Sequence, residues 1–192
     1  MDFRYTTEQE LFRDTLRKFC AENIEPISRE IDEKEDGIPD EIIKGLAAQG
    51  VFGLTIPEQY GGTAPEGEEL TYANIAIHEI ARAEMSMAVP VYTLLCIGWG
   101  LLIAKYGTEQ LKQEVLPKVA AGDYFVGIST TEPGGGSDIA NIQTSGEFKD
   151  GKIVINGEKV YISGVLEAYE QRDGGHITLV RTDPEAGHKG FT

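Results

Sequence analysis

The hydrophobic period of the chain changes once, at Gly122, and this change limits the folds that the chain can adopt. Before Gly122 apolar residues recur at helical spacing, as in the stripe formed by Leu11, Phe12, Leu16 and Phe19. After Gly122 the segment "YFVGIST" alternates and is rich in residues that favour strands. The sequence therefore predicts an α+β chain, with an N-terminal all-α helical domain at residues 1–121 and a small antiparallel β domain at residues 122–192.

Signals for helix ends and tight turns support this division. Thr7 and Glu10 have the spacing of a capping box at the start of the first helix. Thr108 is a candidate N-cap of the last helix, and Gly122 is its candidate C-cap.

Two dipeptides in the β domain indicate tight hairpins. Asp150-Gly151 and Asn156-Gly157 are both typical of type I′ turns, so we expect an antiparallel meander. The chain ends at "HKGFT", which reads as the opening of another strand. An edge cut there would leave unpaired backbone, so we expect the β domain to be incomplete.

The charge of the chain restricts its partners. The 192 residues carry a formal net charge of −15, from 17 basic and 32 acidic residues. This charge argues against nucleic acid and anionic membrane surfaces as partners, and any phosphate site must be built locally. Cys20 and Cys96 lie far apart without metal-ligand spacing, which favours a reducing context over disulfides and predicts no metal site. The N-terminus has no apolar signal segment, so we expect a cytoplasmic location.

One segment, Met85–Ala104, contains no charged residue and has the length of a membrane span. Ser86, Pro90, Thr93 and two glycines dilute its apolar character. We therefore expect a helix buried on all sides inside a soluble bundle rather than a membrane span.

The stretch Gly127–Asp138, "GISTTEPGGGSD", contains three consecutive glycines. A glycine costs roughly 0.5–1 kcal/mol relative to alanine inside regular structure, so the run needs a reason. It could be a wide loop without a ligand, or a loop whose amides approach an anion or cofactor, with Ser137 donating to a phosphate oxygen. It is neither a P-loop nor the Rossmann fingerprint, because no Gly-Lys-Ser/Thr follows and the glycine spacing differs. The residues alone leave the loop's role open.

Five blocks together resemble the acyl-CoA dehydrogenase family of flavoproteins. In chain order they are "IPEQYGG", "KYGTEQLKQEVLPKVAAGD", "TTEPGGGSD", "INGEKVYISG" and "LVRTDPEAGHKGFT". Their order and spacing agree with the family along the whole chain. The resemblance implies an N-terminal helical domain, a middle β domain and a C-terminal four-helix domain, of which this chain would hold the first and part of the second.

The resemblance also implies the cofactor, FAD, and the residues that would hold it. These residues are Thr130 and Thr131 at the flavin pyrimidine, Gly136 and Ser137 at the pyrophosphate, Tyr161 against the ring and Ser163 near flavin N5. Tyr161 stands where the family usually has tryptophan, and Ser163 where it has threonine. The residues implied for substrate binding are Ser137, Leu94, Leu95 and Trp99, although Trp99 is equally consistent with a core residue.

The implied reaction is the α,β-dehydrogenation of an acyl-CoA thioester, an oxidoreductase step of fatty acid metabolism. The family's glutamate base belongs to the C-terminal domain, so the resemblance places no catalytic residue in this chain and implies that the isolated chain is inactive. Expected partners are an acyl-CoA substrate, an electron-transferring flavoprotein or another acceptor, and further copies of the full-length protein in a homo-oligomer. The alternatives are a truncated, non-catalytic binding or assembly partner, and an acyl-CoA oxidase of the same fold.

Overall fold

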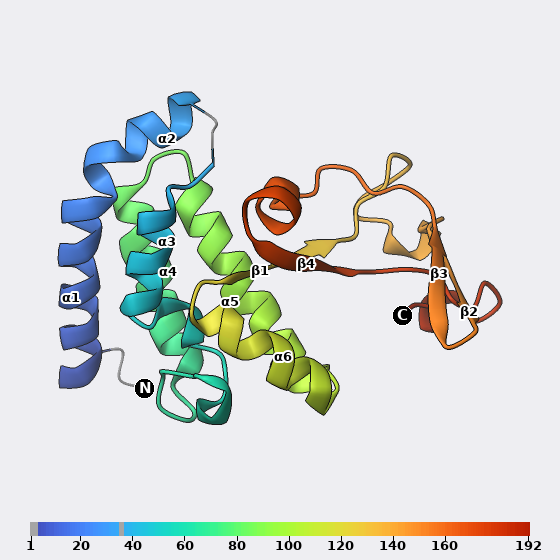
Figure 1. Ribbon diagram of the computed structural model, residues 1–192, viewed down its shortest axis with the longest axis horizontal. Coiled ribbons are helices and arrows are strands. Elements are labelled where there is room, and N and C mark those ends of the chain that lie inside the picture. The colour runs from blue at the N-terminus through green and yellow to red at the C-terminus, as the bar shows by residue number, and fades with distance from the viewer. Residues whose placement is uncertain (1–3, 35–36) are drawn as a thin grey trace.

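The computed structural model describes residues 4–34 and 37–192. Its helices are α1 (Thr7–Asn23), α2 (Ser28–Lys34), α3 (Asp40–Ala48), α4 (Glu69–Ala83), α5 (Ala88–Tyr106) and α6 (Glu109–Ala120). Its strands are β1 (Tyr124–Ser129), β2 (Ser145–Lys149), β3 (Lys152–Asn156) and β4 (Asp173–Thr178). Figure 1 shows the helices gathered on one side and the strands on the other. A mostly helical N-terminal part followed by a small β part is thus confirmed.

The first and last helices begin with capped turns, and one of the two caps differs from the prediction. The capping box of α1 is formed by Thr6 and Gln9, one residue before the predicted pair of Thr7 and Glu10. The Thr6 hydroxyl accepts from the Gln9 amide at 3.2 Å, and Gln9 Oε1 accepts from the Thr6 amide at 3.1 Å. Either glutamine or glutamate can occupy the third position of a capping box. The sequence is therefore consistent with a cap at Thr6 and with a cap at Thr7. Thr108 caps α6 as predicted, accepting from the Leu111 amide.

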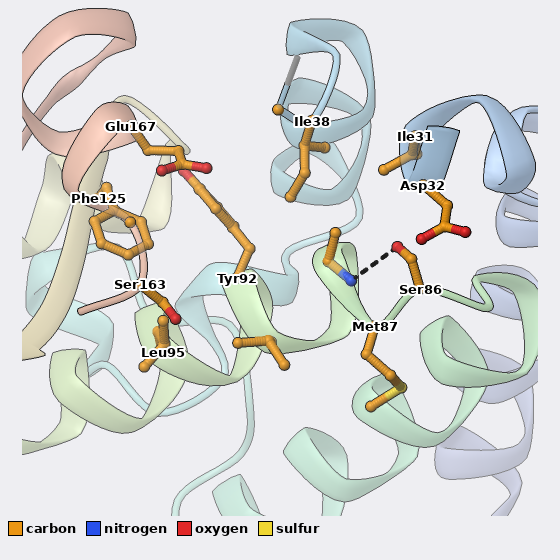
Figure 2. A pocket seen from close by; sticks show the side chains of 14 residues that line it. Ile31, Asp32, Ile38, Ser86, Met87, Tyr92, Leu95, Phe125, Ser163 and Glu167 are labelled. Carbon is orange, nitrogen blue, oxygen red and sulfur yellow. Dashed lines mark hydrogen bonds between the residues drawn. The ribbon is translucent and has the colours of Figure 1, made fainter. Parts of the chain in front are cut away.

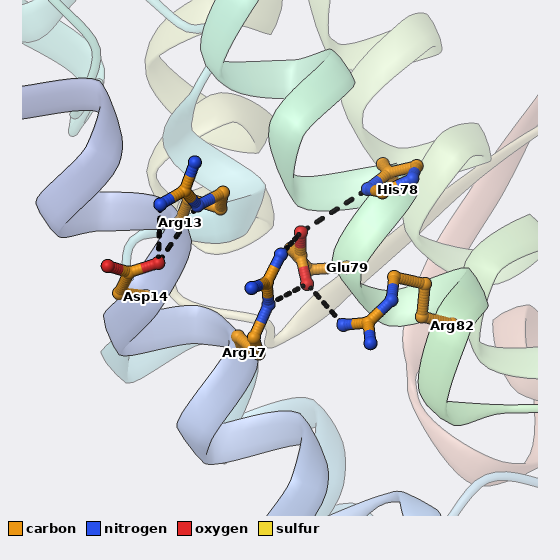
Figure 3. A network of polar contacts seen from close by, with 6 residues as sticks. All are labelled: Arg13, Asp14, Arg17, His78, Glu79 and Arg82. Atoms are coloured by element: carbon orange, nitrogen blue, oxygen red, sulfur yellow. Dashed lines mark hydrogen bonds and ion pairs between the residues drawn. The ribbon is translucent and has the colours of Figure 1, made fainter. Parts of the chain in front are cut away.

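A buried carboxylate joins α1 to α4. Glu79 on α4 is 1% exposed, and both of its oxygens accept hydrogen bonds from Arg17 of α1, each at 2.9 Å. Arg82 donates to the same carboxylate at 2.9 Å (Figure 3). These contacts lower the pKa of Glu79 to about 2, because the Arg17 hydrogen bonds outweigh the opposing effect of burial. The ion pair is therefore in place at neutral pH and fixes how the two helices pack.

Helix α5 covers most of the uncharged segment but is not buried on all sides, so that expectation is wrong. It packs on α4, α6 and β1, while Leu94 and Leu101 are exposed. Among the described residues it is the one helix long and apolar enough to cross a membrane, judged by length and composition, with 44% of its apolar window buried. A core helix of a soluble protein meets the same criteria.

The hairpin β2–β3 follows one turn prediction and contradicts the other. Asp150 and Gly151 connect the strands with φ of 50° and 73°, the left-handed pair that a type I′ turn requires. Asn156-Gly157 forms no second hairpin, since the chain leaves β3 there without a further paired strand. Gly157 is needed for packing instead, because a Cβ there would lie 2.5 Å from Thr144 Oγ1. The predicted meander is therefore wrong.

The strands β1 and β4 pair in parallel, which corrects the all-antiparallel prediction. Tyr124 is opposite Asp173, and the register continues to Ser129 opposite Thr178. A parallel pair needs a long crossover connection, and here the connection is all of the chain between the two strands. The two strands are far apart in the sequence, so neither turn dipeptides nor the alternation of apolar and polar residues could predict their pairing.

The β part meets the helical part along β1. This strand packs against α5 and α6, and the rings of Phe125 on β1 and Tyr92 on α5 lie 5.1 Å apart. Tyr92 in turn contacts Phe52, whereas Phe125 contacts His176 of β4. This row of aromatic rings crosses the boundary, and two of its members, Tyr92 and Phe125, line the cavity described below.

Candidate functional site

The glycine loop, Glu132–Asp138, follows β1 directly and presents an open backbone face. Its residues from Pro133 to Asp138 are exposed. A Cβ built on Gly134 or Gly135 would meet no atom within 4 Å, and one on Gly136 would meet only Thr131 Cγ2, at 3.9 Å. None of the three has positive φ. Neither internal packing nor backbone conformation therefore explains the glycines, whereas the close approach of a bulky ligand to the backbone would.

Glu132, at the start of the loop, points inward and is 9% exposed. Its Oε2 accepts from the Gln143 amide at 2.7 Å. Its Oε1 accepts from the Thr144 amide and from Lys159 Nζ, both at 2.9 Å. Burial raises the pKa of this carboxyl, but the contacts with Thr144, Gln143 and Lys159 outweigh it and lower the pKa to about 2. The carboxylate is therefore ionised and fully occupied by protein donors.

The residues predicted at the flavin come from two segments that the fold brings together. The Val160 amide donates to the Thr131 carbonyl at 2.9 Å, which lays residues 159–163 beside Thr130 and Thr131. Tyr161 is 94% exposed and has φ of 58°, a left-handed conformation that costs about 1–3 kcal/mol for a residue with a side chain. The Ser163 carbonyl lies 3.1 Å from His176 Nε2. Gly136 lies near Thr131, since a Cβ on it would be 3.9 Å from Thr131 Cγ2, and Ser137 is exposed on the loop.

A cavity of about 410 Å³ opens at the boundary between the helical and β parts (Figure 2). Its walls come from the end of α2, the first turns of α5, β1 and the segment after β3. Leu95 and Ser163, predicted to contact substrate and flavin, both line it. Leu94 does not and is exposed on the outer face of α5, while Trp99 packs partly buried against the core. Of the four residues predicted to bind substrate, Leu95 lines the cavity, whereas Leu94, Trp99 and Ser137 are not among its lining residues.

The cavity wall mixes apolar surface with a few polar groups. Tyr92 is buried, and its hydroxyl has no hydrogen-bond partner among the described residues. Glu167, in a π-helical turn at Glu167–Gln171, and Asp32 on α2 bring two carboxylates to the wall. The described lining residues include no lysine, arginine or histidine. A ligand in this cavity would meet apolar side chains, the side chain of Ser163 and two carboxylates.

Sequence reasoning missed Lys159 and the cavity residues Tyr92 and Glu167. Lys159 stands in the block "INGEKVYISG", and Glu132 in "TTEPGGGSD". Each block also contains a second acidic residue, Asp138 in one and Glu158 in the other, so no local charge pattern marked the ion pair. No sequence signal marked Tyr92 either, because its place depends on which face of α5 meets β1.

Comparisons with known proteins show the family of the chain. Residues 6–123 match the model of the acyl-CoA dehydrogenase N-terminal domain. An acyl-CoA dehydrogenase of Bacillus subtilis is 33% identical over 189 residues, which cover 97% of this chain and 47% of that protein. A short-chain specific acyl-CoA dehydrogenase of Clostridium acetobutylicum is also 33% identical, over 100% of this chain and 48% of that protein.

A solved structure extends the likeness to three dimensions. A glutaryl-coenzyme A dehydrogenase in complex with glutaryl-CoA matches with a TM-score of 0.89 at 32% identity, covering 100% of this chain and 47% of that chain. The chain thus spans about half the length of the curated relatives that it matches. Because the family model covers most of the chain and the structural match covers all of it, the chain belongs to the acyl-CoA dehydrogenase family.

Proposed function

We propose that the protein carrying this chain binds FAD at the glycine loop and dehydrogenates an acyl-CoA thioester between Cα and Cβ. The observation that carries the proposal is the open face of the loop, where three glycines serve neither packing nor backbone conformation. A flavin nucleotide is a bulky anionic ligand that such a face suits, because backbone amides can approach its phosphates. Family membership supports the same cofactor.

The residues that would hold FAD are Thr130, Thr131, Gly136, Ser137, Tyr161 and Ser163. Their types fit the group: hydroxyls and amides for the polar edge and phosphates, and an exposed aromatic side chain for the ring. When bound, FAD would supply the hydride acceptor that no amino-acid side chain provides. The chain's own contribution is to bind, orient and partly desolvate the reacting groups.

The boundary cavity is where we place the acyl group. Ser163 and Leu95 line the same cavity, so an acyl chain there would lie next to the proposed flavin site. The apolar part of its wall would exclude water from the acyl chain, which favours a fixed orientation. Ser137 on the glycine loop is proposed as a further contact to substrate.

Three further features belong to the whole protein and are proposals. We place the general base outside this chain, since the relatives are about twice as long as the chain. The electrons would pass to an electron-transferring flavoprotein or another acceptor. We also propose that the full-length protein is a homo-oligomer.

The test is a titration of the full-length apoprotein with FAD, followed by anaerobic dye reduction with acyl-CoAs of several lengths. We expect stoichiometric FAD binding and dye bleaching that depends on acyl-CoA. Rapid oxygen consumption in air would instead identify an oxidase. A folded protein that fails to bind FAD would support the non-catalytic alternative and contradict the proposal.

A further inference from the structure

We propose that Glu132 and Lys159 are positioning residues, which hold the glycine loop in the shape that receives FAD. The inference rests on the proposed function, since it takes the loop to be the FAD site. Neither side chain belongs to the set of residues assigned to FAD above. Their role follows from what they join, which is three segments of chain that are separate in sequence.

The first contact set fixes where the loop begins and ends. The Glu132 carboxylate accepts from the amides of Gln143 and Thr144, which follow the short 3-10 turn Ile139–Asn141 after the loop. Glu132 and Gly135 also exchange backbone hydrogen bonds, each at 3.1 Å, so the turn that presents the glycines starts at the anchored residue. One carboxylate thereby ties the start of the loop to the segment that follows the 3-10 turn.

The second contact set fixes the flavin-facing residues before the loop. Besides Glu132, Lys159 Nζ donates to the Thr130 carbonyl at 3.2 Å. The next amide, that of Val160, donates to the Thr131 carbonyl. The lysine side chain is only 9% exposed, so it is committed to these partners. Lys159 therefore joins both flavin-facing segments to the loop.

The open face of the loop makes this anchoring necessary. Gly134 and Gly135 have no neighbouring atoms that would limit a side chain there. Glycine also adds conformational freedom. A rigid binding shape must then come from groups behind the loop, and Glu132 and Lys159 are buried there. A buried ion pair contributes little net stability, because the cost of removing its charges from water offsets their attraction. We therefore assign the Glu132–Lys159 pair a role in fixing the shape of the loop.

The pair also controls charge near an anionic ligand. A lone carboxylate behind the loop would repel the pyrophosphate, and the chain is already strongly acidic. The Lys159 ammonium, 2.9 Å from Glu132 Oε1, cancels that charge. Replacing the lysine with a neutral residue should therefore weaken FAD binding more than replacing the glutamate, although both changes release the loop.

The experiment compares three variants of the full-length protein: Glu132→Gln, Lys159→Met and, as a matched control, Glu79→Gln. Glu79 is also a buried, ion-paired carboxylate, and it lies on α4 in the helical part. FAD dissociation constants are measured by fluorescence titration of the apoproteins, below the unfolding temperature of each. Circular dichroism and thermal unfolding report the fold separately.

We expect Glu132→Gln to raise the FAD dissociation constant about tenfold or more, as lost charge-assisted hydrogen bonds do, and Lys159→Met to raise it further. The control should unfold at a lower temperature and keep the wild-type dissociation constant within about twofold. Wild-type affinity in folded Glu132→Gln and Lys159→Met, or an equal loss in the control, would overturn the inference. A wild-type protein that binds no FAD would instead overturn the proposed function.

Discussion

Gly136 is a residue whose small size serves nothing inside the chain that the structure describes, and this makes it the sharpest test of the site. Its added Cβ would meet Thr131 Cγ2 at 3.9 Å, an ordinary contact. We expect Gly136→Val to leave the unfolding temperature of the apoprotein unchanged, because the side chain enters open space. The same change should weaken FAD binding about tenfold or more, since it replaces amide approach with a branched side chain.

A matched control for this prediction is Gly164→Ala. There a Cβ would lie 2.0 Å from the Phe125 ring, and the backbone has φ of 80°. We expect that change to destabilise the fold itself, as loss of a required glycine does. Equal loss of stability in both variants, or full FAD affinity in folded Gly136→Val, would contradict the assignment of the loop.

Glu79 provides a prediction with a defined pH window. Its folded pKa of about 2 lies below the ordinary value of 4.5. The stabilisation from its ionised form is therefore complete above about pH 4.5 and is lost as pH falls through about 2. We expect Glu79→Gln to lower the free energy of unfolding at pH 7 by about 2 kcal/mol, typical of hydrogen bonds to charged groups. Urea titrations at several pH values should show this difference shrinking below about pH 4.5, and a difference that grows on acidification would be evidence against the ion-pair account.

The turn between β2 and β3 is the element whose local chemistry is easiest to test. Asp150 and Gly151 both have left-handed φ, and a left-handed residue with a side chain costs roughly 1–2 kcal/mol. We expect Gly151→Val to loosen the hairpin and Asp150→Gly to leave it intact. Phe148 and Ile155 are exposed, so the hairpin can open without unfolding the helices. Hydrogen exchange of the β2 and β3 amides is therefore the measurement, and unchanged protection in Gly151→Val would refute the prediction.

The elements also show which parts of the fold a sequence can predict. The cap at Thr108 and the turn at Asp150-Gly151 depend on neighbouring residues only, and both were predicted correctly. No second hairpin forms at Asn156-Gly157, where Gly157 instead lies against Thr144 of a separate segment. The parallel pairing of β1 and β4 is likewise set by distant segments. Local chemistry is readable from sequence, whereas pairing between remote segments is not.

The same reasoning applies to the candidate site. The glycine loop stood out because its composition is unusual within twelve consecutive residues. The ion pair behind it joins residues 132 and 159, and no local pattern demands that they meet. The cavity needs three elements and the segment after β3 to form its walls. Composition located the binding loop, and only the fold located the residues that support it.

At the scale of the whole molecule, the cavity lies where the helical and β parts meet, so its charge comes from both. Asp32 belongs to α2 and Glu167 to the π-helical turn before β4, and Figure 2 shows both at the wall. With no basic group among the described lining residues, this arrangement should select against an acyl group that carries its own carboxylate. The chain's net charge of −15 acts in the same direction.

The last prediction follows for the full-length protein. We expect kcat/KM for glutaryl-CoA to be at least about tenfold below that for pentanoyl-CoA, which has the same chain length and no terminal charge. The repulsion between like charges in a partly buried site is large enough to lower kcat/KM about tenfold or more. Glu167→Gln should narrow the difference, because it removes one of the two carboxylates and keeps nearly the same shape. Anaerobic dye reduction with both substrates measures the ratio. Equal or better turnover of glutaryl-CoA would contradict this prediction and show that another group neutralises the two carboxylates. If neither substrate were turned over, the proposed dehydrogenase activity would be wrong, and the effect of the charge would not have been measured.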